Sequence, residues 1–247
     1  MKKPVAVTAF SLTLILACLN GAAQTQSRDE VLKEIQAKHA ELVSLEKKFL
    51  EPADADREAY AAFLAEPNTG IIRLLPREKY DANNAHQRVL TLNGAGAFYS
   101  FAHSTHEYGQ GSDIALDQGQ LFIGFAGFDY GMLFNVGDVA LEQLTPEHPA
   151  VRALLEYKPA AKEADARKEH RALWQGIDVG GFTFKSRVPA KVSSTYLLRS
   201  ISYDDSDIAA AFRVVRQDTD GSIILVFKVL KEFPKPKAER TPVAENQ

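Results

Sequence analysis

Cysteine is nearly absent from this chain, and its scarcity excludes two kinds of chemistry. The 247 residues contain a single cysteine, Cys18, which lies in an apolar stretch close to the N-terminus. One thiol cannot form a disulfide within the chain, so a disulfide-stapled fold is excluded. If the N-terminal stretch is removed, no thiol remains to act as a nucleophile either.

An excess of charge of one sign is also missing. Lys and Arg number 29 and Asp and Glu number 32, which leaves a formal net charge of −3. No overall basic field therefore draws the protein toward nucleic acid or anionic lipid, and we expect no nucleic-acid partner. With 45% hydrophobic and 25% charged residues, the composition is that of a folded globular protein and not of a disordered one.

Long hydrophobic runs are limited to one, over residues 5–19. Two lysines follow Met1 before this run, and small residues follow it before Gln24. This order is typical of a secretory signal peptide. We predict that residues 1–23 are removed and that the mature protein is exported, to the periplasm or the medium. The run is short for a transmembrane helix and no later segment approaches it, so no span is expected in the mature chain.

A second interpretation of the N-terminus involves Cys18. The segment Ile15-Leu16-Ala17-Cys18 resembles the bacterial lipobox, whose cysteine carries a lipid anchor and becomes the first mature residue. The match is partial, because Leu usually stands at the position of Ile15 and a small residue at that of Leu16. We favour plain cleavage and keep a membrane-anchored lipoprotein as the alternative.

Helical periodicity marks the start of the mature chain. Apolar residues recur at three- to five-residue steps over 27–49, and Ser27 and Glu30 have the spacing of a capping box. A second, shorter helix is predicted over 54–65. We expect the apolar stripe of the first helix to pack on the sheet that follows. The alternative is a dimerising coiled coil, which is less favoured because the stripe lasts only about three turns.

Two later stretches have the short period and the β-branched and aromatic content of strands, namely 70–139 and 181–231. A helical insertion over 142–175 separates them. The predicted fold class is α+β, with an N-terminal helical pair over 27–66 followed by a twisted antiparallel sheet or open barrel of short strands, interrupted by the helical insertion. We expect one domain over 24–233.

The last strand carries apolar residues on both faces, which is typical of a central or sandwiched strand. Asp218-Thr219-Asp220-Gly221 precedes it and predicts a hairpin turn. These acidic residues also resemble part of a calcium loop, but a turn is the favoured interpretation. Phe227 of this strand is expected to be buried, and the polar segment 234–247 is expected to be a disordered tail.

Known catalytic motifs are absent. The chain has no Gly-x-Ser-x-Gly elbow, no His-Glu-x-x-His and no phosphate-binding loop. One polar constellation stands out, in a glycine-bearing connection between apolar strands, where binding residues tend to lie. Its candidate ligand-binding residues are His103, His106, Glu107, Tyr108 and Asp113.

A divalent metal ion is the weaker interpretation of this connection. His103 and His106 would need a carboxylate from Glu107 or Asp113 to form a minimal ligand set. On a strand, residues three apart point to opposite faces, so the two imidazoles meet only if the backbone turns between them. We favour a solvated or hydrogen-bonded connection that holds no metal, and we predict no cofactor.

Arginines give a second candidate site. Arg187, Arg199 and Arg213 lie on three predicted strands and could converge to bind an anion. We favour the simpler view that they pair with nearby acidic residues or face water. Asp129-Tyr130-Gly131 is interpreted as a turn, and Trp174 as a packing anchor instead of a platform for sugar stacking.

Two classes of function remain. The favoured one is an exported, non-enzymatic binding module for a small molecule, an envelope component or a protein. The alternative is a metal-assisted or general acid/base enzyme that uses the connection from His103 to Asp113. If that connection is ordinary surface, the next candidates for binding are the aromatic residues Phe98, Tyr108, Phe128 and Tyr130.

Overall fold

The computed structural model describes residues 27–81, 90–109, 111–125 and 127–239. The predicted signal peptide and the alternative lipidation site at Cys18 lie outside these residues. The chain divides into two compact units, residues 1–40 and 41–247. The first helix, α1 (Arg28–Leu50), crosses the division.

The start of α1 confirms the predicted capping box. The backbone N–H of Glu30 donates to Ser27 Oγ at 3.2 Å, and that of Ser27 donates to Glu30 Oε2 at 2.8 Å. Within the second unit, Leu50 packs with Leu75 and other apolar residues. Leu45 of the same helix is 57% exposed. The expected packing of the stripe thus holds for Leu50 and is wrong for Leu45, and the coiled coil stays a prediction.

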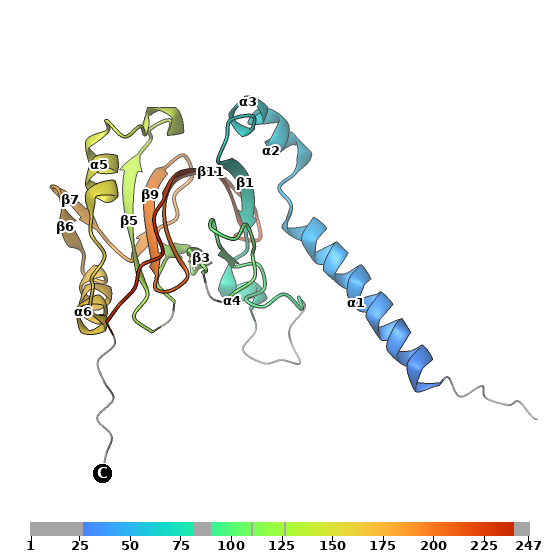
Figure 1. Ribbon diagram of the computed structural model, residues 1–247. Helices are drawn as coiled ribbons and strands as arrows, with labels where there is room; N and C mark the ends of the chain where they lie inside the picture. Colours follow the sequence, from blue (N-terminus) through green and yellow to red (C-terminus); the bar gives the residue numbers. More distant parts are fainter. Residues whose placement is uncertain (1–26, 82–89, 110, 126, 240–247) are drawn as a thin grey trace, which may run out of the picture. The chain divides into compact units, whose positions relative to one another are not determined.

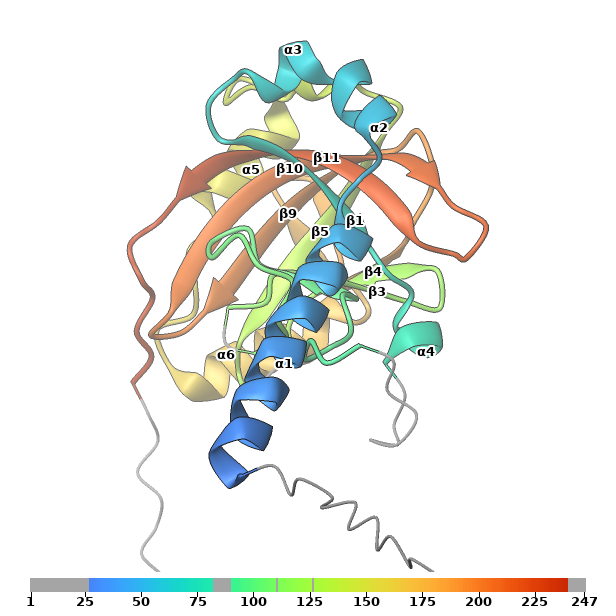
Figure 2. The ribbon, with the colours of Figure 1, turned by 90° about the vertical axis from the view of Figure 1, so that its right-hand side faces the viewer.

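A five-stranded antiparallel sheet forms the centre of the second unit. Its strands follow the order β1-β11-β10-β9-β5. Figure 2 shows β9, β10 and β11 side by side in a strongly curved sheet. The bounds of the strands are β1 Thr69–Leu74, β5 Tyr130–Gly137, β9 Thr195–Ser202, β10 Ser206–Gln217 and β11 Ile223–Glu232.

Both faces of this sheet are buried, as the last strand predicted. On β11, Ile224 and Val226 enter one hydrophobic core, whereas Ile223, Leu225 and Phe227 enter the other. Successive side chains of a strand point to opposite faces, so one apolar strand can supply two cores. The prediction that β11 is central and that Phe227 is buried is confirmed, since β11 pairs with a strand on each side.

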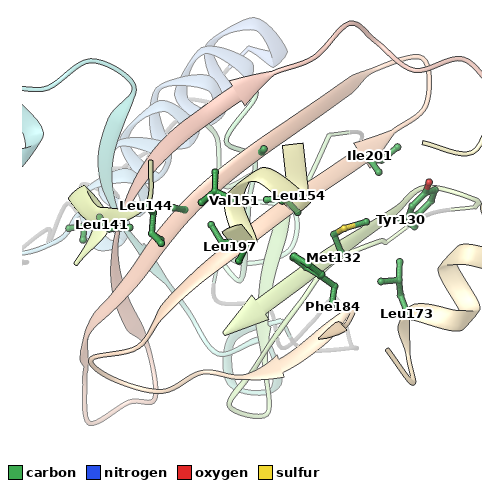
Figure 3. Packing of buried hydrophobic residues seen from close by; sticks show 14 of the residues in the cluster. Tyr130, Met132, Leu141, Leu144, Val151, Leu154, Leu173, Phe184, Leu197 and Ile201 are labelled. Carbon is green, nitrogen blue, oxygen red and sulfur yellow. The ribbon is translucent and has the colours of Figure 1, made fainter. Parts of the chain in front are cut away.

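Helices cover the first face. The helical insertion forms η2 (Leu141–Gln143), α5 (Pro149–Glu156) and α6 (Glu163–Leu173). In Figure 1, α5 and α6 lie along the sheet beside the hairpin of β6 (Ile177–Val179) and β7 (Phe182–Phe184). Figure 3 shows Val151 and Leu154 of α5 close to Leu197 of β9. These apolar contacts fix the insertion on the sheet.

A smaller sheet covers the second face. It has the order β2-β3-β4-β8, and all three pairings are antiparallel. Its apolar side chains share one core with β9, β10 and β11. The bounds of its strands are β2 Phe98–Tyr99, β3 Ile114–Asp117, β4 Gln120–Phe122 and β8 Arg187–Pro189. A two-residue turn joins β3 to β4, whereas a long connection over 100–113 joins β2 to β3 and contains the candidate residues.

The turn between β10 and β11 is a hairpin fixed by charge. Arg73 of β1 lies 3.5 Å from Asp218 and 3.1 Å from Asp220. Tyr80 also donates its hydroxyl hydrogen to Asp220 at 2.8 Å. The two carboxylates thus pair with an arginine of the protein itself, and the antiparallel pairing of β10 and β11 confirms the turn interpretation. Three short helices complete the unit, namely α2 Asp54–Ala59, α3 Ala61–Leu64 and α4 Arg77–Tyr80.

Arg199 is paired inside the protein. It is 1% exposed and donates two hydrogen bonds of 2.9 Å to Asp207, one to each carboxylate oxygen. It also donates to the carbonyl oxygens of Leu154 and Tyr157 at the end of α5. The ring of Phe233 covers its guanidinium group at 3.7 Å. This arginine therefore fastens the helical layer to the sheet and does not bind an external anion.

Two expectations about local structure change. Residues 90–92, which lie in the stretch 70–139 predicted to form strands, form no strand, and residues 82–89 lie outside the described part. Residues 234–239 were expected to begin a disordered tail, but Pro236 and Glu239 form backbone hydrogen bonds with the rest of the second unit. One of them joins Glu239 N–H to the carbonyl oxygen of Ala161. Residues 240–247 lie outside the described part, where disorder stays a prediction.

The arrangement confirms the α+β class, with antiparallel sheets and an inserted helical segment. Among the described residues, no helix combines the length and the apolar character that crossing a membrane requires.

Candidate functional site

The connection from Ser100 to Asp113 is held by one buried carboxylate. Oδ2 of Asp113 accepts hydrogen bonds from the backbone N–H groups of Phe101 at 2.6 Å and Ala102 at 3.2 Å. The hydroxyl of Ser100 donates to the same oxygen at 3.3 Å. Asp113 has no exposed surface. It therefore anchors the connection from within and is not a surface ligand.

Burial makes Asp113 an unusually weak acid. It raises the pKa of the carboxyl group from 3.8 to about 6, although the nearby hydroxyl group of Ser200 and the hydrogen bonds from the backbone and Ser100 act in the opposite direction. The other oxygen, Oδ1, accepts no hydrogen bond from any residue that the structure describes. The carboxyl group of Asp113 is thus buried, a weaker acid than a free aspartate, and unpaired at Oδ1 among the described residues.

The two histidines of the connection have different partners. Nε2 of His103 lies 3.1 Å from Asp205 Oδ2. Nε2 of His106 lies 2.8 Å from the carbonyl oxygen of Arg73, which can only accept, so this nitrogen carries hydrogen. Burial lowers the pKa of His106 below its usual value. Both imidazoles are therefore engaged within the fold.

A metal centre finds no ligand set here. Across the described ranges, no group of three or more His, Cys, Asp or Glu side chains is placed to hold an ion. Glu107 is exposed, and Asp113 is committed to backbone donors. The alternative ligands His103 and His106 are thus not joined by the carboxylates that a minimal site would need.

Tyr108 is the candidate that leads to a cavity. Its ring lies 4.3 Å from that of Phe98 and 6.3 Å from that of Phe125, measured between centroids. It borders two neighbouring cavities, which we call the aromatic cavity and the serine cavity. Of the five candidate residues in the connection, it is the one that lines these cavities.

The aromatic cavity has a volume of about 180 Å³. Two guanidinium groups lie over its aromatic rings. Arg77 is 5.6 Å from the Phe98 centroid, and Arg187 is 5.0 Å from that of Phe122. No acidic side chain lines it among the described residues. Its lining comprises Arg77, Phe98, Tyr108, Phe122, Ile123, Gly124, Phe125, Trp174, Ser186 and Arg187.

Both arginines keep donors available to a ligand. Nε of Arg77 lies 3.2 Å from Asp81, and Nη2 of Arg187 lies 4.0 Å from Asp117. Their side chains are 43% and 35% exposed. A guanidinium group has five N–H donors, so one carboxylate contact leaves others free. Stacking on aromatic rings also holds each group in place without using its donors.

The serine cavity has a volume of about 250 Å³ and a different chemistry. Its lining residues include Ser112, Ser200, Ser202 and Asp129. Oδ1 of Asp129 accepts from the N–H of Tyr203 at 2.9 Å, and Oδ2 accepts from the Ser202 hydroxyl at 3.3 Å. Burial raises the pKa of Asp129.

The aromatic candidates Phe128 and Tyr130 contact other aromatic residues of the fold, and Tyr130 also borders the serine cavity. Tyr130 is 1% exposed, and its hydroxyl lies 3.0 Å from that of Tyr157. The ring of Phe128 packs 4.9 Å from that of Tyr203. Trp174 corrects a sequence interpretation, because it is 61% exposed at the aromatic cavity and is not a packing anchor.

Sequence reasoning missed Arg77, Phe122 and Phe125 as site residues and gave Arg187 a different setting. The pairing of β4 with β8 places Phe122 directly opposite Arg187. Between these two strands lie the 64 residues 123–186. No local sequence pattern encodes a pairing over such a distance. The one signal in the sequence is the pair of aromatic residues in 120–125, more than a short strand needs for packing on one core.

Comparison with known proteins gives no relative: no family model, no curated protein and no solved structure matches this chain.

Proposed function

We propose that this protein is a non-enzymatic binding module and that its ligand is a small molecule with a flat ring and an anionic group. The observation that carries the proposal is the pair of guanidinium groups of Arg77 and Arg187, each lying over an aromatic ring of one cavity that no acidic residue lines in the described part of the chain. Aromatic walls favour a flat apolar body, and guanidinium groups favour a carboxylate or phosphate.

The proposal includes export. It rests on the basic, apolar and small-residue order of residues 1–23, which predicts a mature N-terminus at Gln24. The protein would then meet its ligand in the periplasm or outside the cell. A lipid anchor at Cys18 is the alternative.

An enzyme that uses general acid/base chemistry is the second candidate. Its support is Asp113, whose pKa of about 6 allows proton transfer close to neutral pH. The carboxyl group has no exposed surface, and three donors already occupy Oδ2. A ligand cannot reach it without movement of the connection, so binding is the better supported function.

The test uses Trp174, the single tryptophan of the chain, as an internal reporter at the cavity. We expect 2-naphthoate to change its fluorescence in a saturable way and the neutral 2-naphthamide to bind about tenfold more weakly. Arg187→Gln should weaken naphthoate binding about tenfold or more, because a charge-assisted hydrogen bond is lost. Calorimetry on the same samples separates loss of binding from loss of the signal.

Arg152→Gln is the matched control, because it removes the same charge from an exposed position on α5 that lines neither cavity. Its affinity should equal that of the wild type. The proposal is wrong if Arg187→Gln and Arg77→Gln both bind naphthoate as the wild type does, or if no aromatic acid binds at millimolar concentration.

A further inference from the structure

The two cavities are immediate neighbours. Tyr108, Gly124 and Phe125 border both of them. With volumes of about 180 and 250 Å³, each is smaller than the range of roughly 300–1,000 Å³ that is usual for ligand sites. This size favours a ligand that occupies both cavities and passes along their shared border.

The charges of the two cavities are opposite. Arg77 and Arg187 line the aromatic cavity, whereas Asp129 lines the serine cavity, where no Lys or Arg is among the described lining residues. The hydrogen-bond donors to Asp129 are a backbone N–H and a serine hydroxyl, both neutral. In the described part of the chain no Lys or Arg forms an ion pair with this half-buried carboxylate.

Further negative charge lies next to the serine cavity. The charge of Asp205 is close enough to raise the pKa of Asp129. Asp113 follows the lining residue Ser112 and lies against the lining residue Ser200, with Oδ1 unpaired among the described residues. The basic side chains near these carboxylates are two histidines, His103 beside Asp205 and His170. Because no Lys or Arg is among the described residues that line the serine cavity, the carboxylates favour a cationic ligand group at this end of the site.

We propose that the ligand is zwitterionic, with a flat ring and its carboxylate in the aromatic cavity and a primary ammonium group in the serine cavity. The ammonium group replaces the missing counter-charge of Asp129 and donates to the serine hydroxyls, while the carboxylate meets Arg77 and Arg187. This inference rests on the proposed function, because it adds a second contact to the same ligand.

The experiment compares two series of probes on the full mature chain. One consists of 4-(ω-aminoalkyl)benzoates of increasing chain length, and the other of the matching 4-(ω-hydroxyalkyl)benzoates. Affinities are measured by calorimetry and by Trp174 fluorescence. We expect one chain length at which the amine binds about tenfold more tightly than the alcohol. Asp129→Asn should remove this preference and leave the affinity for the alcohol within about twofold.

Asp178→Asn is the matched control. Asp178 is an exposed acid on β6 that lines neither cavity, and its amide replacement can still accept the hydrogen bond from Gly181 N–H. This variant should keep the full preference for the amine. If Asp129→Asn does not fold, the comparison of amine and alcohol on the wild type decides alone.

The outcomes separate the two proposals. Equal affinity for amine and alcohol at every chain length, or an amine preference that survives Asp129→Asn, overturns the zwitterion inference while benzoate binding upholds the proposed function. Failure of both series to bind overturns the proposed function itself.

Discussion

The strands β9 to β11 and the segment from residue 93 to 125 belong to the same unit but differ in the length of their strands and in how their backbone is held. All eight residues of β9 are buried. The strands β10 and β11 are 12 and 10 residues long, and both of their faces are largely covered. The segment 93–125 contains strands of only two, four and three residues. Its connection is held by hydrogen bonds to Asp113 instead of by a continuous sheet.

This difference explains where a ligand site can form. Long strands that bury both faces supply the hydrophobic stabilisation of the unit. The short strands then need not close every gap, and aromatic side chains such as Tyr108 and Phe125 border cavities instead of a filled core. The polar residues of the connection thus lie on a segment that packs against the stable sheet.

The largest effect is expected from Phe227→Ala, which tests the sheet itself. Phe227 is 7% exposed and packs against Tyr99 and Phe101, at 5.9 and 4.9 Å between ring centroids. Truncation should lower the free energy of unfolding by about 3–5 kcal/mol, as buried phenylalanines do. Denaturant unfolding measures this change. Lys228→Ala, which removes an exposed ion pair with Glu66, should cost at most about 1 kcal/mol.

A loss below about 1 kcal/mol for Phe227→Ala would contradict the comparison, because β11 would then not be a stabilising centre.

An intermediate effect, of opposite sign, is expected from Asp113→Asn. The folded-state pKa of about 6 exceeds the unfolded value of 3.8, so the folded protein retains the proton longer and stability falls as the pH rises from about 4 to about 6. The amide is permanently neutral and can still accept from Phe101 and Ala102. At about pH 7.5 the variant should therefore be more stable than the wild type, by up to about 3 kcal/mol.

Urea unfolding of both proteins over a series of pH values measures this gain, which should shrink to near zero at about pH 4. His106 acts in the opposite direction, because its pKa is lowered and its contribution is lost as the pH falls below about 6.5. That contribution is common to both proteins and cancels in their difference. A variant that is less stable than the wild type at about pH 7.5 but equally stable at about pH 4 would show that the charge of Asp113 is needed to hold the connection.

The smallest effect on stability is expected from Trp174→Ala. Trp174 is 61% exposed and meets Arg187 at 5.8 Å. Thermal or denaturant unfolding should change by no more than about 0.5 kcal/mol, while calorimetric affinity for 2-naphthoate should fall. A stability loss above about 2 kcal/mol would place this residue in the core and remove the distinction between the two regions.

Much of the fold was predictable because its signals are local. The capping box of Ser27 and Glu30, the hairpin turn at Asp218–Gly221 and the two apolar faces of β11 all appear within a few consecutive residues. Residues 90–92 failed as a strand because propensity alone does not supply a pairing partner.

Less of the site could be predicted. His103, His106 and Asp113 stood out by residue type, but burial and internal hydrogen bonds occupy them, and only the three-dimensional structure shows such partners. Arg187 reaches Phe122 through a pairing between strands that are distant in sequence. An exposed Trp174 has no sequence signal that distinguishes it from a buried one.

The pairing of β1 with β11 also has a consequence for the order of folding. Among the described residues, β1 is the first strand and β11 is the last, and all six residues of β1 pair with β11. Ile72 and Leu74, which are buried in the finished sheet, must wait for almost the whole chain to be synthesised before their partner strand exists. The sheet is therefore completed only when β11 has been synthesised and pairs with β1 and β10. Contacts between residues so distant in sequence make folding slow. A chain cut short before β11 leaves its first strand without a partner.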